Sequence, residues 1–288
     1  MAIMLAVDIG GTKVAAGRVD EDGRLLIRSA RPTPQGGADQ VFGAVLEAIN
    51  EVRASDELAC GVGCGGPMAP GGETVSPLNI TAWRGFPLPA RLESALGVPV
   101  HVDNDAKALA LGEGWKGGAR GVRNFLAMVV STGVGGGIVL DGNLLDGAAG
   151  NAGHIGHVIV EPDGRECPCG ARGCLEAEAS GTAIAARTGR PAAEAPDEER
   201  ARAGRLVGRA VASVANLLDL QLALVAGSVA LGYGDVFFRA AREELAERAR
   251  IGFAAGTRIE PAGLGDAGPL IGAAAVAWRA TGRTIGGG

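Results

Sequence analysis

The hydrophobic positions in the first half of the chain predict a sheet followed by helices. Residues 3–9 form an almost continuous apolar run, which is typical of a buried strand with Asp8 near its end. Two further strand-like runs follow after short turns, at 14–19 and 25–31, so the chain opens with a three-strand meander. Apolar residues at helical spacing then predict a helix. The elements expected after the meander are a helix at 38–53, strands at 60–63 and 98–102, and a helix at 106–115.

This opening pattern recurs in the second half of the chain. A strand at 125–130 is followed by a glycine-rich segment at 131–137, and short strands are expected at 138–140 and 144–145. Such self-similarity suggests two domains of one ancestral topology that face each other, although two glycine-rich hairpins can also arise independently. The rest of the chain is expected to hold a polar surface connection at 189–204, helices at 206–218, 236–250 and 270–278, and a strand at 222–226.

Composition excludes several classes of protein. The chain has 288 residues, of which 47% are hydrophobic and 20% charged, so it can bury a large core and is not a disordered chain. The net charge of −5 argues against partners such as nucleic acid or an anionic membrane surface. No apolar run reaches the ~18 residues of a membrane span. The N-terminus lacks the basic region of a secretory signal, which predicts a cytoplasmic location.

Two glycine-rich segments are candidate phosphate-binding loops. In the first, Asp8 is followed by Gly10, Gly11, Thr12 and Lys13, so backbone N–H groups and a hydroxyl could meet phosphate oxygens while Asp8 holds Mg²⁺ through water. The spacing is not that of a P-loop, and the alternative is a tight hairpin turn with a capping aspartate. The second segment offers two hydroxyls and four glycines in seven residues, among them Thr132, Gly133 and Gly135.

A pair of carboxylates marks the expected strand-to-helix junction at residues 102–106. A carboxylate at such a junction is most often a helix cap, and Asp103 is the better placed candidate for that role. Asp105 is then available as a general base toward a substrate hydroxyl.

A histidine and three cysteines predict a zinc site. Cys167, Cys169 and Cys174 lie within eight residues and, with His157, complete a Cys₃His set for a structural zinc ion. The alternatives are three buried thiols or a redox pair, and His154 is a rival ligand to His157. Cys60 and Cys64 lie in an apolar stretch and are expected to be buried as small hydrophobic residues.

These motifs together resemble the ROK family of bacterial sugar kinases, of the glucokinase type. The resemblance rests on Asp8–Lys13, Asn104-Asp105, Ser131–Gly136, Gly153–His157 and Cys167–Glu176, and it spans about residues 3 to 279. It implies an α/β, two-lobed actin/hexokinase-like fold, a duplicated RNase H-like arrangement with a cleft between the lobes. It also implies ATP and Mg²⁺ as cofactors beside structural Zn²⁺, and phosphorylation of a hexose at O6.

The resemblance also implies roles for individual residues. Asp105 would be the catalytic base, and the remaining assignments fall into a sugar side and a nucleotide side. The sugar side would comprise Gly65, Asn79, Asn104, Asp105, His154, His157 and Glu176, with His157 also bound to zinc. The nucleotide side would comprise Asp8, Gly10, Gly11, Thr12, Lys13, Thr132, Gly133, Gly135 and Gly227.

One departure from the family pattern bears on the substrate. His154 stands where the family usually has glutamate. A carboxylate accepts two sugar hydroxyls, whereas a neutral imidazole offers one donor and one acceptor. The substrate is therefore open among glucose, an amino sugar, another hexose and a cyclitol. Ser228 replaces a residue of a common glycine run, and we expect little effect from it.

The resemblance sets expectations for domains and partners. A small lobe is expected at 1–118, completed by a C-terminal helix at about 268–283, and a large lobe at 119–267 with a zinc-binding loop at 157–176. The expected partners are a sugar, a nucleotide and further copies of the chain in a homodimer or homotetramer. The rival function is a sugar-responsive regulator, which this family also includes with an added DNA-binding domain. The motif at Asp8 leaves little room before it for such a domain.

Overall fold

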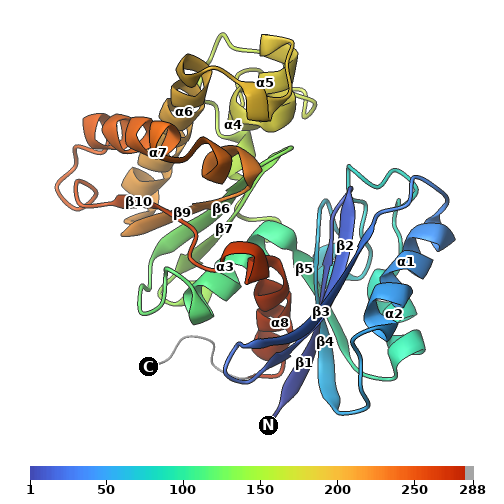
Figure 1. Ribbon diagram of the computed structural model, residues 1–288. Coiled ribbons are helices and arrows are strands. Elements are labelled where there is room, and N and C mark those ends of the chain that lie inside the picture. Colours follow the sequence, from blue (N-terminus) through green and yellow to red (C-terminus); the bar gives the residue numbers. More distant parts are fainter. Residues whose placement is uncertain (283–288) are drawn as a thin grey trace. The chain divides into compact units, whose positions relative to one another are not determined.

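The chain folds into two units, each built on one five-stranded sheet (Figure 1). The computed structural model describes residues 1–282. The first unit comprises Met1–Gly121, Asp146–Ala152 and the segment that begins at Leu264, and the second comprises Val122–Leu145 and Gly153–Gly263. The chain therefore passes from one unit to the other at four places. Within the described residues, no helix combines the length and apolarity that a membrane span requires.

The first sheet has the strand order β3-β2-β1-β4-β5. β1 pairs antiparallel with β2, and β2 pairs antiparallel with β3, which gives the expected meander. β4 lies parallel to β1 on its other side, and β5 lies parallel to β4. The strands are β1 (Ile3–Ile9), β2 (Lys13–Asp20), β3 (Leu25–Pro32), β4 (Glu57–Cys64) and β5 (Val100–Asn104).

Helices cover both faces of the first sheet (Figure 1). Because side chains alternate along a strand, Leu5 and Val7 of β1 join the core beneath α1, whereas Met4 and Ala6 join the core beneath α8. Asp8 has the same parity as Met4 and Ala6, which directs it toward the face of α3 and α8. The helices of this unit are α1 (Ala38–Asn50), α2 (Leu88–Leu96), α3 (Asp105–Lys116) and α8 (Gly268–Ala280), with single turns η1 (Pro70–Gly72) and η4 (Gly265–Ala267).

The second sheet repeats the topology of the first. Its order is β8-β7-β6-β9-β10, with an antiparallel meander β6-β7-β8 and parallel neighbours β9 and β10 on the other side of β6. The duplicated arrangement that the sequence pattern predicts is thereby confirmed. The strands are β6 (Phe125–Val130), β7 (Val134–Leu140), β8 (Asn143–Leu144), β9 (Leu222–Ala226) and β10 (Arg258–Pro261).

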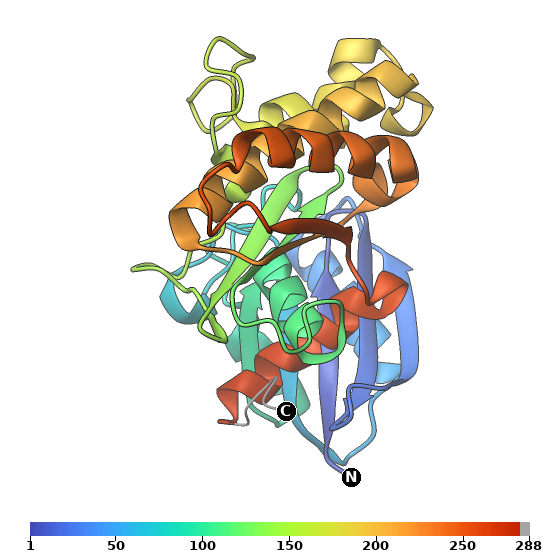
Figure 2. The same ribbon diagram turned by 90° about the vertical axis from the view of Figure 1, so that its left-hand side faces the viewer.

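Two long helices cover one face of the second sheet (Figure 2). They approach closely where α6 has glycines, since a Cβ on Gly204 or Gly208 would lie 2.3 Å from a carbonyl oxygen of α7. The long helices are α6 (Asp197–Leu218) and α7 (Ser228–Arg248). The short ones are α4 (Leu175–Ala179) and α5 (Gly181–Thr188), with single turns η2 (Ile155–His157) and η3 (Ala192–Glu194).

The structure corrects several element boundaries. Residues 197–204, expected in a surface connection, form the first turns of α6, where three acidic residues favour the helix N-terminus. α7 begins at Ser228 instead of 236. Gly234 has non-helical backbone angles within it, so the helical spacing of apolar residues is interrupted there. Elements that the pattern did not reveal are α2, α4, α5 and β10. The C-terminal helix ends at Ala280, and residue 283 of its expected range lies outside the described residues.

Candidate active site and metal centre

The turn between β1 and β2 brings the first glycine-rich motif to the end of the sheet. Gly10 N–H donates to Lys13 O at 2.9 Å, and the Thr33 hydroxyl donates to Gly10 O at 2.7 Å, so the turn is fixed from both sides. The side chains of Thr12 and Lys13 are exposed. A Cβ on Gly11 would lie 2.5 Å from Asn79 Cβ, which places Asn79 directly against this turn.

Two carboxylates flank the end of β4 next to this turn. A Cβ on Gly63 would lie 3.8 Å from Asp8 Oδ1 and 3.6 Å from Asp105 Cα. Both acidic residues therefore lie in contact range of Gly63. Burial raises the pKa of Asp8 to about 7, the Asp105 charge adds to the rise, and Lys13 opposes it. Burial, followed by the same two carboxylates, also raises the pKa of Cys64. A divalent cation at Asp8 would relieve this repulsion, and Mg²⁺ prefers such oxygen ligands.

The junction between β5 and α3 presents Asp105 to solvent. The cap of α3 is Asn104, whose side-chain oxygen accepts from Ala106 N–H at 3.0 Å, so the assignment of the cap to Asp103 was wrong. Asp103 instead accepts from Asn104 N–H and pairs with Lys107, because it is still part of β5. Asp105 is the first residue of α3, and its Oδ1 also accepts from Ala106 N–H at 2.8 Å.

The sugar-side residues Gly65 and Asn104 lie near each other in the first unit. A Cβ on Gly66, next to Gly65, would lie 3.4 Å from Asn104 Nδ2. Gly65 itself lies against Pro77, two residues before Asn79. These contacts gather three predicted sugar-side residues, Gly65, Asn79 and Asn104, around the ends of β4 and β5.

The second glycine-rich motif is shorter than expected. Only Ser131, Thr132 and Gly133 form the turn between β6 and β7, because Gly135–Gly137 belong to β7 and pair with β6. Ser131 N–H donates to Gly133 O at 2.9 Å, and the Thr182 hydroxyl donates to Thr132 O at 2.9 Å.

Glu176 closes the same turn from α4. Its Oε2 accepts from Val134 N–H at 2.8 Å, and a Cβ on Gly133 would lie at the same distance from that oxygen. A side chain at this position would push the carboxylate away from the Val134 N–H. The structure thus places Glu176, a predicted sugar ligand, beside Gly133, a predicted nucleotide ligand.

Gly227 lies next to this turn at the start of α7. Its φ of +100° is a conformation that side chains disfavour, and a Cβ would lie 2.3 Å from Val130 O. The following residue, Ser228, shares a hydrogen bond with Ser131 between their hydroxyl oxygens at 2.9 Å. A helix N-terminus beside a turn is a favourable place for an anion such as phosphate.

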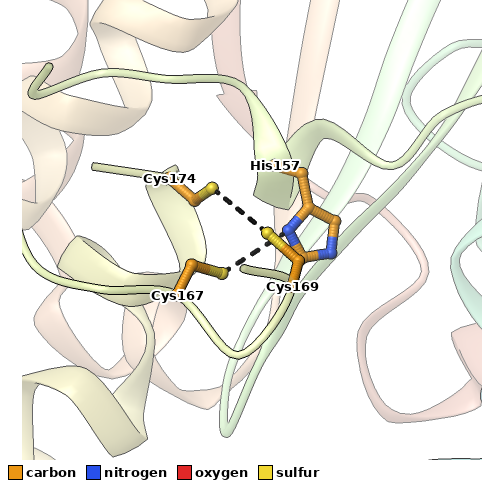
Figure 3. A group of neighbouring side chains, drawn as sticks. All are labelled: His157, Cys167, Cys169 and Cys174. Carbon is orange, nitrogen blue, oxygen red and sulfur yellow. Dashed lines mark hydrogen bonds between the residues drawn. The ribbon is translucent and has the colours of Figure 1, made fainter. Parts of the chain in front are cut away.

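Four side chains of the second unit converge on one point (Figure 3). The candidate ligand atoms of His157, Cys167, Cys169 and Cys174 all lie within 4.8 Å of one another. Cys169 Sγ lies 3.7 Å from Cys174 Sγ, and Cys167 Sγ lies 3.7 Å from His157 Nδ1. His154 is not one of the four, although its ring lies 6.0 Å from that of His157.

These distances fit a tetrahedral zinc ion. Zn–S bonds of about 2.3 Å put two sulfur ligands about 3.8 Å apart, and a sulfur and a nitrogen ligand slightly closer. Figure 3 shows Nδ1 of His157 directed toward the thiols and Nε2 on the far side of the ring. Without a cation, burial raises the pKa of Cys174 to about 12, whereas a backbone hydrogen bond lowers the pKa of Cys169. The donor set therefore suits a cation that stabilises thiolates.

Comparison with known proteins decides the family. A model of the ROK family matches residues 4–280. The chain belongs to the ROK family. An N-acetylmannosamine kinase of Citrobacter koseri is 38% identical over 246 residues, which cover 80% of this chain and 84% of that protein.

Two solved structures of ROK family proteins are similar throughout. A ROK hexokinase from Thermus thermophilus is 35% identical with a TM-score of 0.81, covering 97% of this chain and 99% of that one. A ROK family glucokinase from Streptomyces griseus, solved with glucose and AMPPNP, is 31% identical with a TM-score of 0.80, covering 95% and 98%. The two-lobed α/β fold expected from the resemblance is thereby confirmed.

Within this ROK family fold, the structure adds residues that sequence reasoning missed. Gly63 lies between the two carboxylates, and its signal was a small residue at the end of a strand that otherwise reads as apolar core. Lys107 and Glu113 are buried charged residues of α3, 3% and 0% exposed, which a helical pattern cannot distinguish from solvent-facing ones. Cys60 and Cys64 are fully buried, as expected.

Proposed function

We propose that this ATP-dependent sugar kinase phosphorylates the 6-hydroxyl of an N-acylated amino sugar, with N-acetylmannosamine as the first candidate. The observation that supports the phosphoryl-transfer chemistry is the arrangement around Gly63. Asp8 is a half-buried carboxylate suited to bind Mg²⁺. It lies beside Asp105, an exposed carboxylate suited to accept a proton. Phosphoryl transfer asks a protein mainly for positioning and charge stabilisation, with one group to orient the nucleophile.

Asp105 would accept the proton of the sugar hydroxyl as that oxygen bonds to the γ-phosphorus of ATP, while the bond from this phosphorus to the bridging oxygen breaks and ADP leaves. Its place at the first residue of α3 supports this role, since the Asn104 cap and the Ala106 N–H fix the backbone while the side chain stays exposed. Mg²⁺, held through water by Asp8, would supply charge stabilisation for the phosphates.

The nucleotide would lie along the two hairpin turns. The backbone N–H of Gly11, the Thr12 hydroxyl and the Lys13 ammonium suit phosphate oxygens from the first unit, while the N–H of Gly10 closes the turn. From the second unit, Thr132, Gly133 and Gly135 would also contact the nucleotide phosphates. Gly227, at the N-terminus of α7, would join them. We propose the two units as the lobes of the kinase.

The sugar is proposed to bind the residues that the family resemblance assigns to it. Gly65, Asn79 and Asn104 would contribute from the first unit, and His154, His157 and Glu176 from the second. The direction of His157 Nδ1 toward the thiols supports a double role, since it leaves Nε2 for a sugar hydroxyl. A zinc ligand whose other nitrogen holds a substrate is fixed in tautomer and orientation.

A structural zinc ion is proposed for the cluster of His157, Cys167, Cys169 and Cys174. All four ligands come from the protein, so no open position is needed. The loop that carries the cysteines leads directly into α4, where Glu176 lies. Zinc would thereby order two sugar-side residues, His157 and Glu176, at once.

The choice of an amino sugar rests on His154 and on the relatives. The side chain of His154 is exposed next to His157. A neutral imidazole can pair one donor and one acceptor with the N–H and C=O of an acylamino group, whereas a carboxylate suits two hydroxyls. The 38% identity to an N-acetylmannosamine kinase agrees with this reading. Glucose is the second candidate, which the likeness to a glucokinase solved with glucose favours.

A substrate panel tests the proposal. The purified protein would be assayed with ATP and Mg²⁺ on N-acetylmannosamine, N-acetylglucosamine, mannose and glucose, with product identified by its phosphate position. We expect kcat/KM for N-acetylmannosamine to exceed that for glucose by roughly tenfold or more, the scale of one pocket contact. A higher value for glucose would reject the amino-sugar assignment, and no turnover of any sugar would reject the kinase role.

Variants at His154 separate the possible reasons for selectivity. His154→Glu should move the ratio of kcat/KM values toward glucose by roughly tenfold, and His154→Gln, which adds no charge, should move it less. Zinc content measured on the same samples should stay unchanged, since His154 is outside the cluster. An unchanged ratio of kcat/KM values, with zinc content also unchanged, would reject a role of His154 in the choice of sugar. The cytoplasmic location and the homodimer or homotetramer stay predictions.

A further inference from the structure

Helix α3 carries two buried charged side chains that the chemistry above does not use. Lys107 is 3% exposed and Glu113 is fully buried. Removing a charge from water is costly unless close partners compensate, so the partners of such residues indicate what the fold uses them for.

Lys107 holds the segment Asp146–Ala152. Its Nζ lies 3.0 Å from Asp103 Oδ1 and 2.9 Å from Asp146 Oδ1, and it donates to Gly150 O at 3.1 Å. Arg279 of α8 donates to Asp146 Oδ2 at 2.7 Å. The hydrogen bond from Arg279, with Lys107 as the next favourable partner, lowers the pKa of Asp146 to about 2. The carboxylate is therefore ionised at any physiological pH.

This segment is bounded by two of the four places where the chain passes from one unit to the other. It follows β8 and precedes His154 in sequence, yet it belongs to the first unit. Ala152 N–H donates to Asp146 O at 3.0 Å, so the two ends of the segment are joined to each other. By holding Asp146 and Gly150, Lys107 fixes the crossings at 145–146 and 152–153 together.

Glu113 holds the other two crossings. Its Oε2 accepts from Gly118 N–H at 2.7 Å, three residues before the crossing at 121–122. Its Oε1 accepts from Leu264 N–H at 3.0 Å, directly after the crossing at 263–264.

The helix that bears both residues is itself packed tightly on α8 (Figure 1). A Cβ on Gly272 would lie 2.5 Å from Ala108 O, and one on Gly112 would lie 3.0 Å from Gly272 Cα. Glycines on both helices allow this close approach. Lys107 and Glu113 are therefore carried by a closely packed pair of helices.

We infer that Lys107 and Glu113 are positioning residues that anchor all four inter-unit crossings to α3, the helix that begins with Asp105. One helix would thus carry both the proposed base and the residues that hold the chain where it passes between the units. The consequence for substrate rests on the proposed function: the chain leaves the Lys107 anchor at Ala152 and reaches His154 and His157 within five residues. Sugar binding should then depend on Lys107.

Hydrogen exchange measured by mass spectrometry on the full chain tests the anchoring. Lys107→Met and Asp146→Asn should each speed exchange at 146–152 roughly tenfold, with little change at 118–122 and 264–266. Glu113→Gln, whose amide keeps only one acceptor, should speed exchange at 118–122 and 264–266 and leave exchange at 146–152 little changed. The matched control is Lys116→Met on the same helix, whose ammonium lies over the Trp115 ring, outside this network. Asp146→Asn, at a half-exposed site, keeps the test valid if Lys107→Met does not fold.

Calorimetric binding on the same proteins tests the consequence. Lys107→Met and Asp146→Asn should raise the Kd of the preferred sugar roughly tenfold and leave the Kd of ATP within about twofold. Exchange equal to that of Lys116→Met, or a uniform rise over the chain, would overturn the anchoring. Faster exchange at 146–152 with an unchanged sugar Kd would overturn the positioning role. A wild-type protein that binds no sugar would sink the proposed function, and the exchange pattern would still decide the anchoring.

Discussion

The two hairpin turns at equivalent places of the two sheets have the same length and different surroundings. Gly10–Thr12 joins β1 to β2, and Ser131–Gly133 joins β6 to β7. Each turn has three residues and is closed by a hydrogen bond of 2.9 Å. The two turns therefore share their length and their place in the topology, and backbone groups of such a turn can meet a phosphate.

The strand behind each turn makes the difference. Asp8 of β1 pairs with Gly63 of the parallel neighbour, and its counterpart Val129 of β6 pairs with Ala226. The carboxylate beside the second turn is that of Glu176, which comes from α4 and accepts a backbone hydrogen bond. One duplicated scaffold thus places the proposed cation ligand Asp8 and the proposed base Asp105 beside the first turn, and a neutral strand beside the second. The chemistry is expected to depend on the surroundings of the first turn more than on those of the second.

The largest effect is expected at Asp105. Asp105→Asn removes the proton acceptor and keeps the shape, so turnover should fall by roughly 10²–10⁴ while the sugar Kd changes little. Steady-state kinetics and calorimetry on one preparation measure both. The matched control is Asp39→Asn, which also removes an acidic residue from the first turn of a helix. Turnover close to that of the control would remove Asp105 from the chemistry.

The proposed zinc site should matter next, through stability. Cys174→Ala should lower zinc from about one ion per chain to almost none and lower the apparent Tm by roughly 5–10 °C, because metal binding is coupled to folding. Cys60→Ala removes another fully buried thiol outside the cluster and should keep its zinc. Elemental analysis and thermal melts check both variants. A wild-type chain purified without chelator and found free of zinc would contradict the proposed site.

The sequence pattern located the meanders because buried strands are continuous apolar runs, as at 3–9 and 125–130. It located the cysteine cluster because metal ligands need fixed spacing. It could not place Asn79 against Gly11, or Glu176 against Gly133, since these contacts join segments that lie far apart along the chain. It also misjudged Asp103, because capping depends on where the first helical turn begins. Here Asn104 occupies that position.

Asp8 carries a titratable carboxyl where the second sheet has Val129, so magnesium binding is expected to depend on pH through Asp8. The carboxyl of Asp8 has a pKa of about 7, so below that pH a cation must displace a proton. The apparent Kd for Mg²⁺ should therefore rise about tenfold per pH unit below 7 and level off above it. Magnesium titrations from pH 5.5 to 8.5 test this. Asp8→Asn should bind weakly at every pH, and a wild-type profile flat through pH 7 would contradict the assignment.

The same group predicts an effect on stability of known sign. The folded-state pKa of Asp8 lies above its ordinary value of 3.8, so the ionised form destabilises the native state. Stability should fall as the pH rises from about 4 to about 7 in the absence of a divalent cation. Asp8→Asn should remove this fall and stabilise the chain at pH 8 by roughly 1–3 kcal/mol. Denaturant unfolding of both proteins in chelator gives the difference. Equal free energies of unfolding at pH 8 would mean that Asp8 is not destabilised by burial.

The smallest effect is expected at Glu176, on the neutral side of the comparison. Glu176→Gln keeps an oxygen for the Val134 N–H, so the turn at Gly133 should hold its shape. What is lost is the charge, and a hydrogen bond to a charged acceptor exceeds a neutral one by about 1 kcal/mol, or roughly fivefold in affinity. We therefore expect the sugar KM to rise about fivefold with kcat within about twofold. Glu166→Gln, on the exposed ion pair with Arg172, is the control for charge alone. A loss of turnover as large as that of Asp105→Asn would show that the second turn carries charge essential to the chemistry, and the contrast between the two hairpins would fail.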